Sequence, residues 1–165
     1  MDMNHLLLNA VGEGQVEEIR RLVGIGADVH AKDGHGSSVL AFAAMRGQVK
    51  ASEVLVELGA DVHAQADNGY TALHAAARGG HADVTKTLLE LGADVHAMDL
   101  NGHTALCPAA GCGHADVVRA LGEMGADVSA RSPDAGYALL DSARKGHVEV
   151  VKALLELGAD IETRG

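Results

Sequence analysis

The stretch that decides the fold is Gly-Ala-Asp-Val-His-Ala, which occurs at residues 26–31, 59–64 and 92–97. Related phrases follow, GADVSA from Gly125 and GADIET from Gly158, so that five copies stand 33 residues apart. A fixed period of this length indicates supersecondary units that bury their apolar faces only by stacking on their neighbours. The sequence therefore predicts an elongated stack whose function lies on a long surface.

The composition of the 165-residue chain fits such a stack. Most of the 21 glycines fall at repeated places, and with one Phe, two Tyr and no Trp the core must come from closely packed Leu, Val, Ile and Ala. We expect one continuous domain over residues 1–165. The expected repeats are 1–32, 33–65, 66–98, 99–131 and 132–164.

The charge and the cysteine content exclude several classes of function. Thirteen basic residues against 23 acidic ones give a formal net charge of −10, which opposes binding to nucleic acid or to an anionic membrane. Two cysteines are too few for a secreted disulfide framework, and the start of the chain has no basic targeting region. No apolar run approaches the roughly 20 residues that span a bilayer. We therefore expect an intracellular chain, cytoplasmic or nuclear.

Residues 66–98 are the cleanest copy of the repeat. The sequence Asp-Asn-Gly at 67–69 is a tight-turn signal because Gly accepts a positive φ. A first helix should follow, with Thr71 as its N-cap and Gly80 closing it in a left-handed conformation. A second helix is expected at about 82–91, where apolar residues keep a helical spacing.

This copy resembles the ankyrin repeat. The resemblance rests on TALHAAARGGHADV from Thr71 and LLELGADVHA from Leu88, and it extends over essentially the whole chain. It implies an all-α solenoid of stacked helix-turn-helix units joined by β-turn or hairpin loops. It also implies a non-catalytic module that binds another protein.

The copies depart from the pattern in several places. Pro108 falls in the first turn of its helix, which should therefore begin late or bend. In the last copy the turn glycine, Gly136, is shifted by one place, and Asp141 takes a position that is apolar in the other full copies. The first copy carries polar residues suited to a solvent-facing cap, whereas residues 148–155 are as apolar as an internal helix. We expect a piece of a longer protein, or self-association through the C-terminal repeat.

The histidines recur with the repeat. Neighbouring members of the series His30, His63 and His96 should be separated by roughly 8–10 Å, so two of them cannot share a zinc ion, which holds its ligands at about 2 Å. We predict that each of these side chains hydrogen-bonds a neighbouring loop. The resemblance adds another interpretation, because an oxygen-dependent asparaginyl hydroxylase modifies ankyrin repeats at this position. His74 belongs to the family signature and is predicted to be structural.

The remaining candidates for chemistry are also interpreted as structural. His81, His114 and His147 follow helix-closing glycines, as in the Gly-His pair of the family. Cys107 and Cys112 lack the spacing of a zinc or redox motif, which predicts a buried thiol and a surface thiol respectively. Short Gly-x-Gly fragments lack the strand that precedes a phosphate loop. No catalytic residue, cofactor or metal site is therefore expected.

The resemblance assigns ligands to the turn tips and to the exposed face of each first helix, which together line a concave surface. By position it selects Lys32, His35, Ser37, Met45, Arg46, Gln65, Asp67, Asn68, Tyr70, Arg78, Met98, Leu100, Asn101, His103, Cys112, Arg131, Asp134, Arg144 and Lys145. Six of the 13 basic residues are in this set, against two acids. We predict an acidic or phosphorylated protein segment as the ligand, held by Arg46, Arg78 and Arg144; the competing interpretation is that these cations only solvate the surface.

Two other functions stay open from the sequence. One is an engineered ankyrin binder, against which the unequal copies count. The other is a targeting module that belongs to a larger enzyme. A metal-binding module ranks last.

Overall fold

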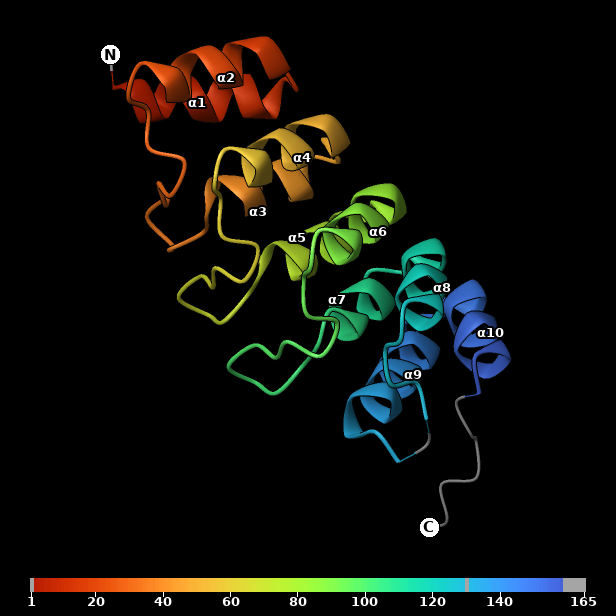
Figure 1. Cartoon of the computed structure of the whole chain (residues 1–165). Coiled ribbons are helices and arrows are strands. Elements are labelled where there is room, and N and C mark those ends of the chain that lie inside the picture. Colours follow the sequence, from red (N-terminus) through yellow and green to blue (C-terminus); the bar gives the residue numbers. More distant parts are fainter. Residues whose placement is uncertain (1, 130, 159–165) are drawn as a thin grey trace.

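The computed structural model describes residues 2–129 and 131–158, which form ten helices arranged as successive pairs (Figure 1). The first helices of the pairs are α1 (Met3–Gly12), α3 (Val39–Met45), α5 (Ala72–Gly79), α7 (Leu106–Gly111) and α9 (Pro133–Lys145). The second helices are α2 (Val16–Gly24), α4 (Val49–Glu57), α6 (Ala82–Glu90), α8 (Ala115–Glu123) and α10 (Val148–Glu156). The second helices begin every 33 residues, so the period of the sequence is the period of the structure.

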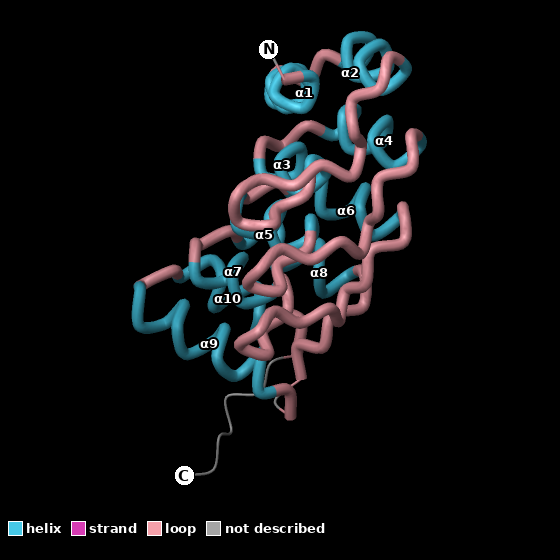
Figure 2. The backbone as a smooth tube through the Cα atoms, turned by 90° about the vertical axis from the view of Figure 1, so that its left-hand side faces the viewer, coloured by secondary structure: helices cyan, strands magenta, loops and turns pink. Residues whose placement is uncertain are grey.

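The pairs stack in two layers. Each first helix packs against the next first helix, and each second helix against the next second helix. The loops that join consecutive pairs project from the stack and lie side by side (Figure 2). Single backbone hydrogen bonds join neighbouring loops, from Asp67 N–H to the His35 carbonyl at 3.1 Å and from Leu100 N–H to the Asn68 carbonyl at 3.0 Å. The predicted all-α solenoid is confirmed.

The core consists of leucines that repeat in register. Leucines of the first layer are at most 1 % exposed at positions 7, 40, 73 and 106, and those of the second layer at positions 22, 55, 88, 121 and 154. Burial of each side chain contributes roughly 1.5–3 kcal/mol. Fully buried alanines, such as Ala76 and Ala77, let adjacent first helices approach closely. Each leucine contributes fully only when the next pair is in place, because the neighbouring repeat covers part of it.

One side-chain hydrogen bond recurs between consecutive repeats, and we call it the inter-repeat bond. Its donors are the residues that precede the second helices, Gln48, His81, His114 and His147, whose side chains do not cap their own helices. The Nε2 atom donates to a carbonyl oxygen at the C-terminal end of the first helix in the preceding repeat. The acceptors, in the same order, belong to Gly12 (3.1 Å), Met45 (2.9 Å), Arg78 (3.0 Å) and Gly111 (3.2 Å). The predicted structural role of these three histidines is confirmed.

The glycine in front of each of the first three donors makes room for the side chain of the next donor. Gly80 has a φ of +78°, and a Cβ atom added to it would lie 2.6 Å from Nδ1 of His114. The left-handed conformation and the close ring contact both exclude a side chain there. The two residues of the Gly-His pair therefore contact different repeats. The histidine bonds the preceding repeat, and the glycine lies against the ring of the following repeat.

The histidines of the phrase Gly-Ala-Asp-Val-His-Ala behave differently from our prediction. His30, His63 and His96 are exposed, and no hydrogen bond of their side chains is present in residues 2–129 and 131–158. Instead, the backbone N–H of each donates to Oδ1 of the Asp two residues earlier, at 2.8–2.9 Å. The prediction of side-chain bonds to neighbouring loops is wrong, because the Asp already closes this turn.

The irregular copies change the starts of two helices. α7 begins at Leu106, one residue later in its repeat than α5, as Pro108 predicted. The turn expected near Gly136 is absent, because α9 begins at Pro133 and Gly136 lies inside it. Ser132 caps this helix through its Oγ, and proline is favourable as the first helical residue. The prediction of a shifted turn is therefore wrong.

The last copy of the repeated phrase, GADIET from Gly158, lies almost wholly outside the described residues, so the expected end of the last repeat is not described.

The last helix pair exposes apolar side chains, since Leu140 is 70 % exposed and Val148 is 59 % exposed. No helix in the described part of the chain combines the length and the apolar character needed to cross a bilayer.

Removing one inter-repeat bond should destabilise the stack. We expect His114→Ala to lower the free energy of unfolding by about 1–2 kcal/mol, because the Arg78 carbonyl loses its partner. His114→Gln should retain most of the stability, since Gln48 makes the same bond in the chain itself. His96→Ala is the control and should change stability by less than about 0.5 kcal/mol. Urea unfolding followed by circular dichroism measures all three, and equal losses for the Ala and Gln variants would contradict the role of the bond.

Substitution of two glycines distinguishes the cost of a steric clash between loops from the cost of backbone strain alone. Both Gly69 and Gly59 have positive φ, +83° and +102°. A Cβ at Gly69 would lie 2.8 Å from the backbone nitrogen of Leu100, whereas a Cβ at Gly59 meets nothing within 4 Å. Gly69→Ala should therefore cost about 1–3 kcal/mol more than Gly59→Ala in chemical denaturation. Equal costs would show that the loops separate freely.

Candidate binding surface

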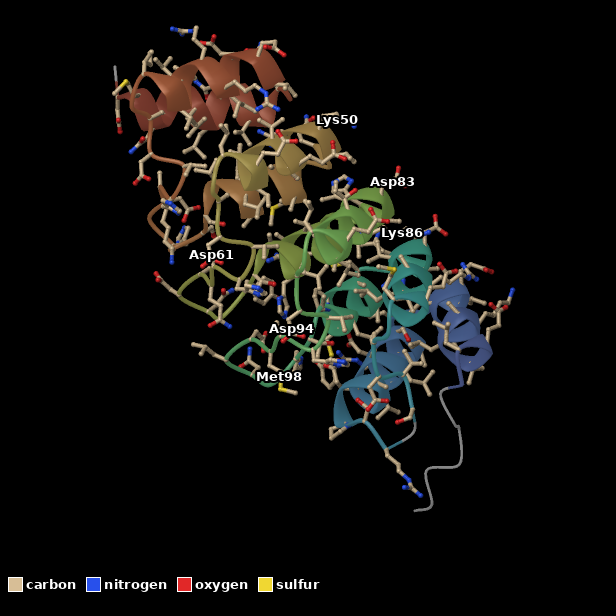
Figure 3. The ribbon with its side chains drawn as sticks, viewed as in Figure 1. Lys50, Asp61, Asp83, Lys86, Asp94 and Met98 are labelled. Carbon is tan, nitrogen blue, oxygen red and sulfur yellow. The ribbon has the colours of Figure 1, made fainter. Side chains whose placement is uncertain are left out.

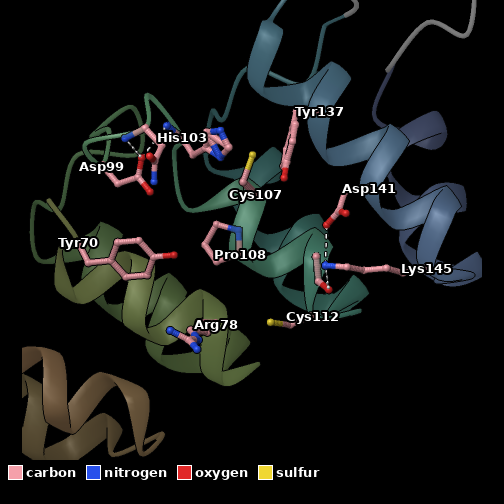
Figure 4. Close-up of a pocket in the computed structure, with 12 residues that line it drawn as sticks. Tyr70, Arg78, Asp99, His103, Cys107, Pro108, Cys112, Tyr137, Asp141 and Lys145 are labelled. Atoms are coloured by element: carbon pink, nitrogen blue, oxygen red, sulfur yellow. Dashed lines mark hydrogen bonds and ion pairs between the residues drawn. The ribbon is translucent and has the colours of Figure 1, made fainter. Parts of the chain in front are cut away.

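Two depressions open next to each other on the side formed by the first helices and the loop tips. The larger one, of about 300 Å³, is lined by Tyr70, Arg78, Asp99, Asn101, His103, Cys107, Pro108, Gly111, Cys112, Tyr137, Asp141 and Lys145 (Figure 4). The smaller one, of about 160 Å³, is lined by Asp33, Ser37, Ala41, Phe42, Met45, Ala66, Asn68, Tyr70, Thr71, Ala75 and Arg78. Tyr70 and Arg78 line both, so they form the wall between the two depressions.

Tyr70 is held firmly at this wall. Its backbone N–H donates to Oδ1 of Asn68 at 3.0 Å, and its ring stacks on His74 with centroids 5.0 Å apart. Burial raises the pKa of Tyr70, and the negative charge of Asp99 raises it further. The phenol therefore stays protonated and can donate a hydrogen bond to an anionic ligand.

His74, behind Tyr70, joins two repeats. Its Nδ1 accepts a hydrogen bond from the backbone N–H of Thr71 at 3.2 Å, so Nε2 carries the proton and donates to the His103 carbonyl at 3.0 Å. Burial lowers the pKa of His74, which keeps the ring neutral. The predicted structural role is confirmed, and His74 fixes the loop of the next repeat beside the larger depression.

Arg78 lies in the last turn of α5 and is exposed. No ion pair of its guanidinium is present among the described residues, whereas its backbone carbonyl is held by His114. The charge of Arg78 is therefore free to meet a ligand in either depression. Arg46, one repeat earlier, lies over the Phe42 ring, 5.2 Å from its centroid.

Two basic residues of α9, Arg144 and Lys145, are already paired. Lys145 Nζ lies 2.7 Å from Oδ2 of Asp141 and also donates to the Gly111 carbonyl at 3.1 Å. Arg144 lies 2.8 Å from the other oxygen of Asp141. Lys145 and then Arg144 hold the pKa of Asp141 below its usual value. Arg144, which we expected to be available to a ligand, is therefore engaged within its own helix.

Asp134 is not on the binding surface. Its side chain is buried, where Oδ1 accepts from the Thr104 N–H at 3.2 Å and from the Cys107 thiol at 2.7 Å. Oδ2 accepts from the Thr104 hydroxyl at 2.5 Å. Asp134, which we predicted among the partner-binding residues, is instead buried against the preceding repeat, because α9 begins early, at Pro133.

The structure brings about half of the predicted residues to the two depressions. Ser37, Met45 and Asn68 line the smaller one, and Asn101, His103, Cys112 and Lys145 line the larger one, in addition to the shared wall. The predicted residues that line neither are Lys32, His35, Arg46, Gln65, Asp67, Met98, Leu100, Arg131, Asp134 and Arg144. Lys32 instead donates to the Gln65 carbonyl at 2.9 Å.

Sequence reasoning missed several lining residues. Asp99 follows from the repeat, because it precedes a turn as Asp33 does, and its Oδ1 accepts the N–H groups of Asn101 and His103. Asp141 was visible as an acid at an apolar position. Tyr137 gave no signal, since its place in the repeat belongs to a loop in other copies and to a helix here.

Comparison with known families agrees with this geometry. A family model described as ankyrin repeats (3 copies) matches residues 7–99 and again residues 93–164, which is almost the whole chain. A search among curated proteins finds no match. Ankyrin repeats generally act as protein–protein interaction modules and are typically non-catalytic. With its 33-residue helix pairs and these matches, the chain belongs to the ankyrin-repeat family.

Proposed function

We propose that the chain binds a segment of a partner protein across the two depressions, with an acidic or phosphorylated side chain of the partner against Arg78. The observation that carries this proposal is the shared wall, where a guanidinium without an ion pair among the described residues and a protonated phenol line the same two depressions. Together they offer charge-assisted and neutral hydrogen bonds to one anionic group.

The apolar part of the surface supports a protein ligand. Met45 is 45 % exposed next to the smaller depression, and Phe42 lines the same depression. Tyrosine, methionine and arginine are the residues enriched at protein interfaces, where rigid aromatic side chains supply most of the affinity. The inter-repeat bonds keep this surface preformed, so binding requires little ordering.

The charges of the larger depression restrict where an acid can bind. Asp99 repels an anion on one side of the larger depression, whereas Lys145 and Arg144 are both held in ion pairs by the single carboxylate of Asp141. Arg78 is therefore the lining cation without an ion pair in the described part of the chain, and it is the one that an acidic group of the partner meets in this proposal. This arrangement is narrower than the continuous basic surface that the sequence predicted.

The proposal is tested by charge reversal at the wall. Partner proteins captured from lysate by the full chain should bind about 10–100-fold more weakly to Arg78→Glu, because charge-assisted hydrogen bonds are lost. Arg21→Glu is the matched control, since Arg21 lies on α2 in the second-helix layer and pairs with Glu18. Affinity is measured by calorimetry with each identified partner, before and after phosphatase treatment.

The outcomes separate the alternatives. A loss on phosphatase treatment identifies a phosphorylated ligand, and a partner unaffected by phosphatase but lost with Arg78→Glu identifies an acidic one. Binding that survives Arg78→Glu and Tyr70→Ala but not Arg21→Glu would place the site on the second-helix layer and overturn the proposal.

A further inference from the structure

Three side chains of metal-ligating types meet at the edge of the larger depression. His103, in the loop before α7, Cys107, on α7, and Asp134, on α9, each offer one ligand atom, and these atoms all lie within 4.8 Å of one another. Figure 4 shows the Cys107 sulfur directed toward the side where His103 and Tyr137 lie. The three residues come from two consecutive repeats, so only the stacked chain brings them together.

The carboxyl group of this cluster has no ion-pair partner among the described residues. Asp134 and Cys107 are buried, and no ion pair in the described part of the chain involves Asp134. Burial raises the pKa of the Cys107 thiol, and its hydrogen bond to Asp134 raises it further, so the thiol is protonated. The Asp134 carboxyl group thus lies inside the stack with hydrogen bonds from Thr104 and Cys107 but, in the described part of the chain, with no cation beside it.

We propose that His103, Cys107 and Asp134 bind one divalent transition-metal ion of the zinc type, with a fourth position open to the larger depression. The ion replaces the proton of the Cys107 thiol, which now donates to Asp134, and this proton leaves to the solvent. Thiolate and carboxylate then balance the two positive charges of the ion. One imidazole, one thiolate and one carboxylate are ligands that zinc accepts.

The distances fit this exchange. With bonds of about 2.3 Å to sulfur and about 2.0 Å to nitrogen and oxygen, tetrahedral ligand atoms stand about 3.3–3.6 Å apart. The Cys107 sulfur and Oδ1 of Asp134 are now 2.7 Å apart, and the whole set spans no more than 4.8 Å. Binding therefore requires the sulfur and oxygen to separate, and the imidazole to approach, each by about 1 Å.

The surroundings hold the ligands in place. The backbone N–H of His103 donates to Asp99 at 3.0 Å, and its ring packs on Tyr137 with centroids 4.7 Å apart. The Thr104 hydroxyl donates to Oδ2 of Asp134, which leaves Oδ1 directed at the sulfur. Hydrogen bonds of this kind to a ligating carboxylate orient it and tune the affinity for metal.

Cobalt(II) chloride titrated into the full chain is the test, because tetrahedral cobalt with a thiolate ligand has intense visible bands and a sulfur-to-metal absorption in the near ultraviolet. We expect these bands to saturate at one ion per chain and to disappear when zinc displaces the cobalt. Calorimetry with zinc in two buffers of different ionisation enthalpy should show about one proton released per ion.

Matched variants assign the ligands. Cys107→Ser should abolish the sulfur-to-metal absorption, and His103→Gln should abolish the tetrahedral bands. Cys112→Ser, which removes the exposed thiol, should leave both signals unchanged. Thr104→Val should weaken binding by about 10–100-fold with the bands preserved. His103 is partly exposed, so its variant is expected to fold, and circular dichroism checks each protein. Absence of the bands in the parent chain, or their loss with Cys112→Ser alone, would overturn the proposal.

Discussion

The inter-repeat bond is the interaction on which the rest of the structure depends. The residue that precedes a second helix donates from its side chain to a carbonyl at the end of the first helix in the preceding repeat, and this bond recurs at four consecutive junctions. Helix ends carry carbonyl groups that have no partner within the helix, so each repeat supplies what its neighbour lacks. The bond also sets the spacing of the stack, because the glycine beneath each ring leaves room for no side chain.

This constraint makes the candidate surface rigid. His114 holds the carbonyl of Arg78, and His74 holds the carbonyl of His103, so residues on both edges of the larger depression are fixed through their backbones. Their side chains remain free to vary without loss of the stack. In Arg78 and His103 the backbone carbonyl stabilises the fold, and the side chain lies on the binding surface. One residue can therefore serve both purposes.

The sequence was sufficient for the fold because local signals and the period agree. Thr71, Gly80 and the leucine spacing each predict the same helix pair, and the structure has it within one residue. The candidate site was predicted only in part, because reading by position assumes that every copy has the same local structure. Ser132 and Pro133 break that assumption by starting α9 early, which buries Asp134 and brings Tyr137 against His103. Counting the charges at equivalent repeat positions also did not reveal that Asp141 and Arg144 pair with each other within α9.

The backbone N–H of the threonine before the first helix has a different hydrogen-bond acceptor in two consecutive repeats, and this difference affects the surface. In one repeat His74 accepts the Thr71 N–H from within its own helix. In the next, Cys107 stands at the histidine position, and Asp134 of the following repeat accepts the Thr104 N–H instead. The smaller depression therefore depends on α3 and α5, whereas the larger one takes Tyr137, Asp141 and Lys145 from α9. Because α9 departs from the repeat and α5 does not, a change in the last repeat alters one half of the surface and leaves the other half intact.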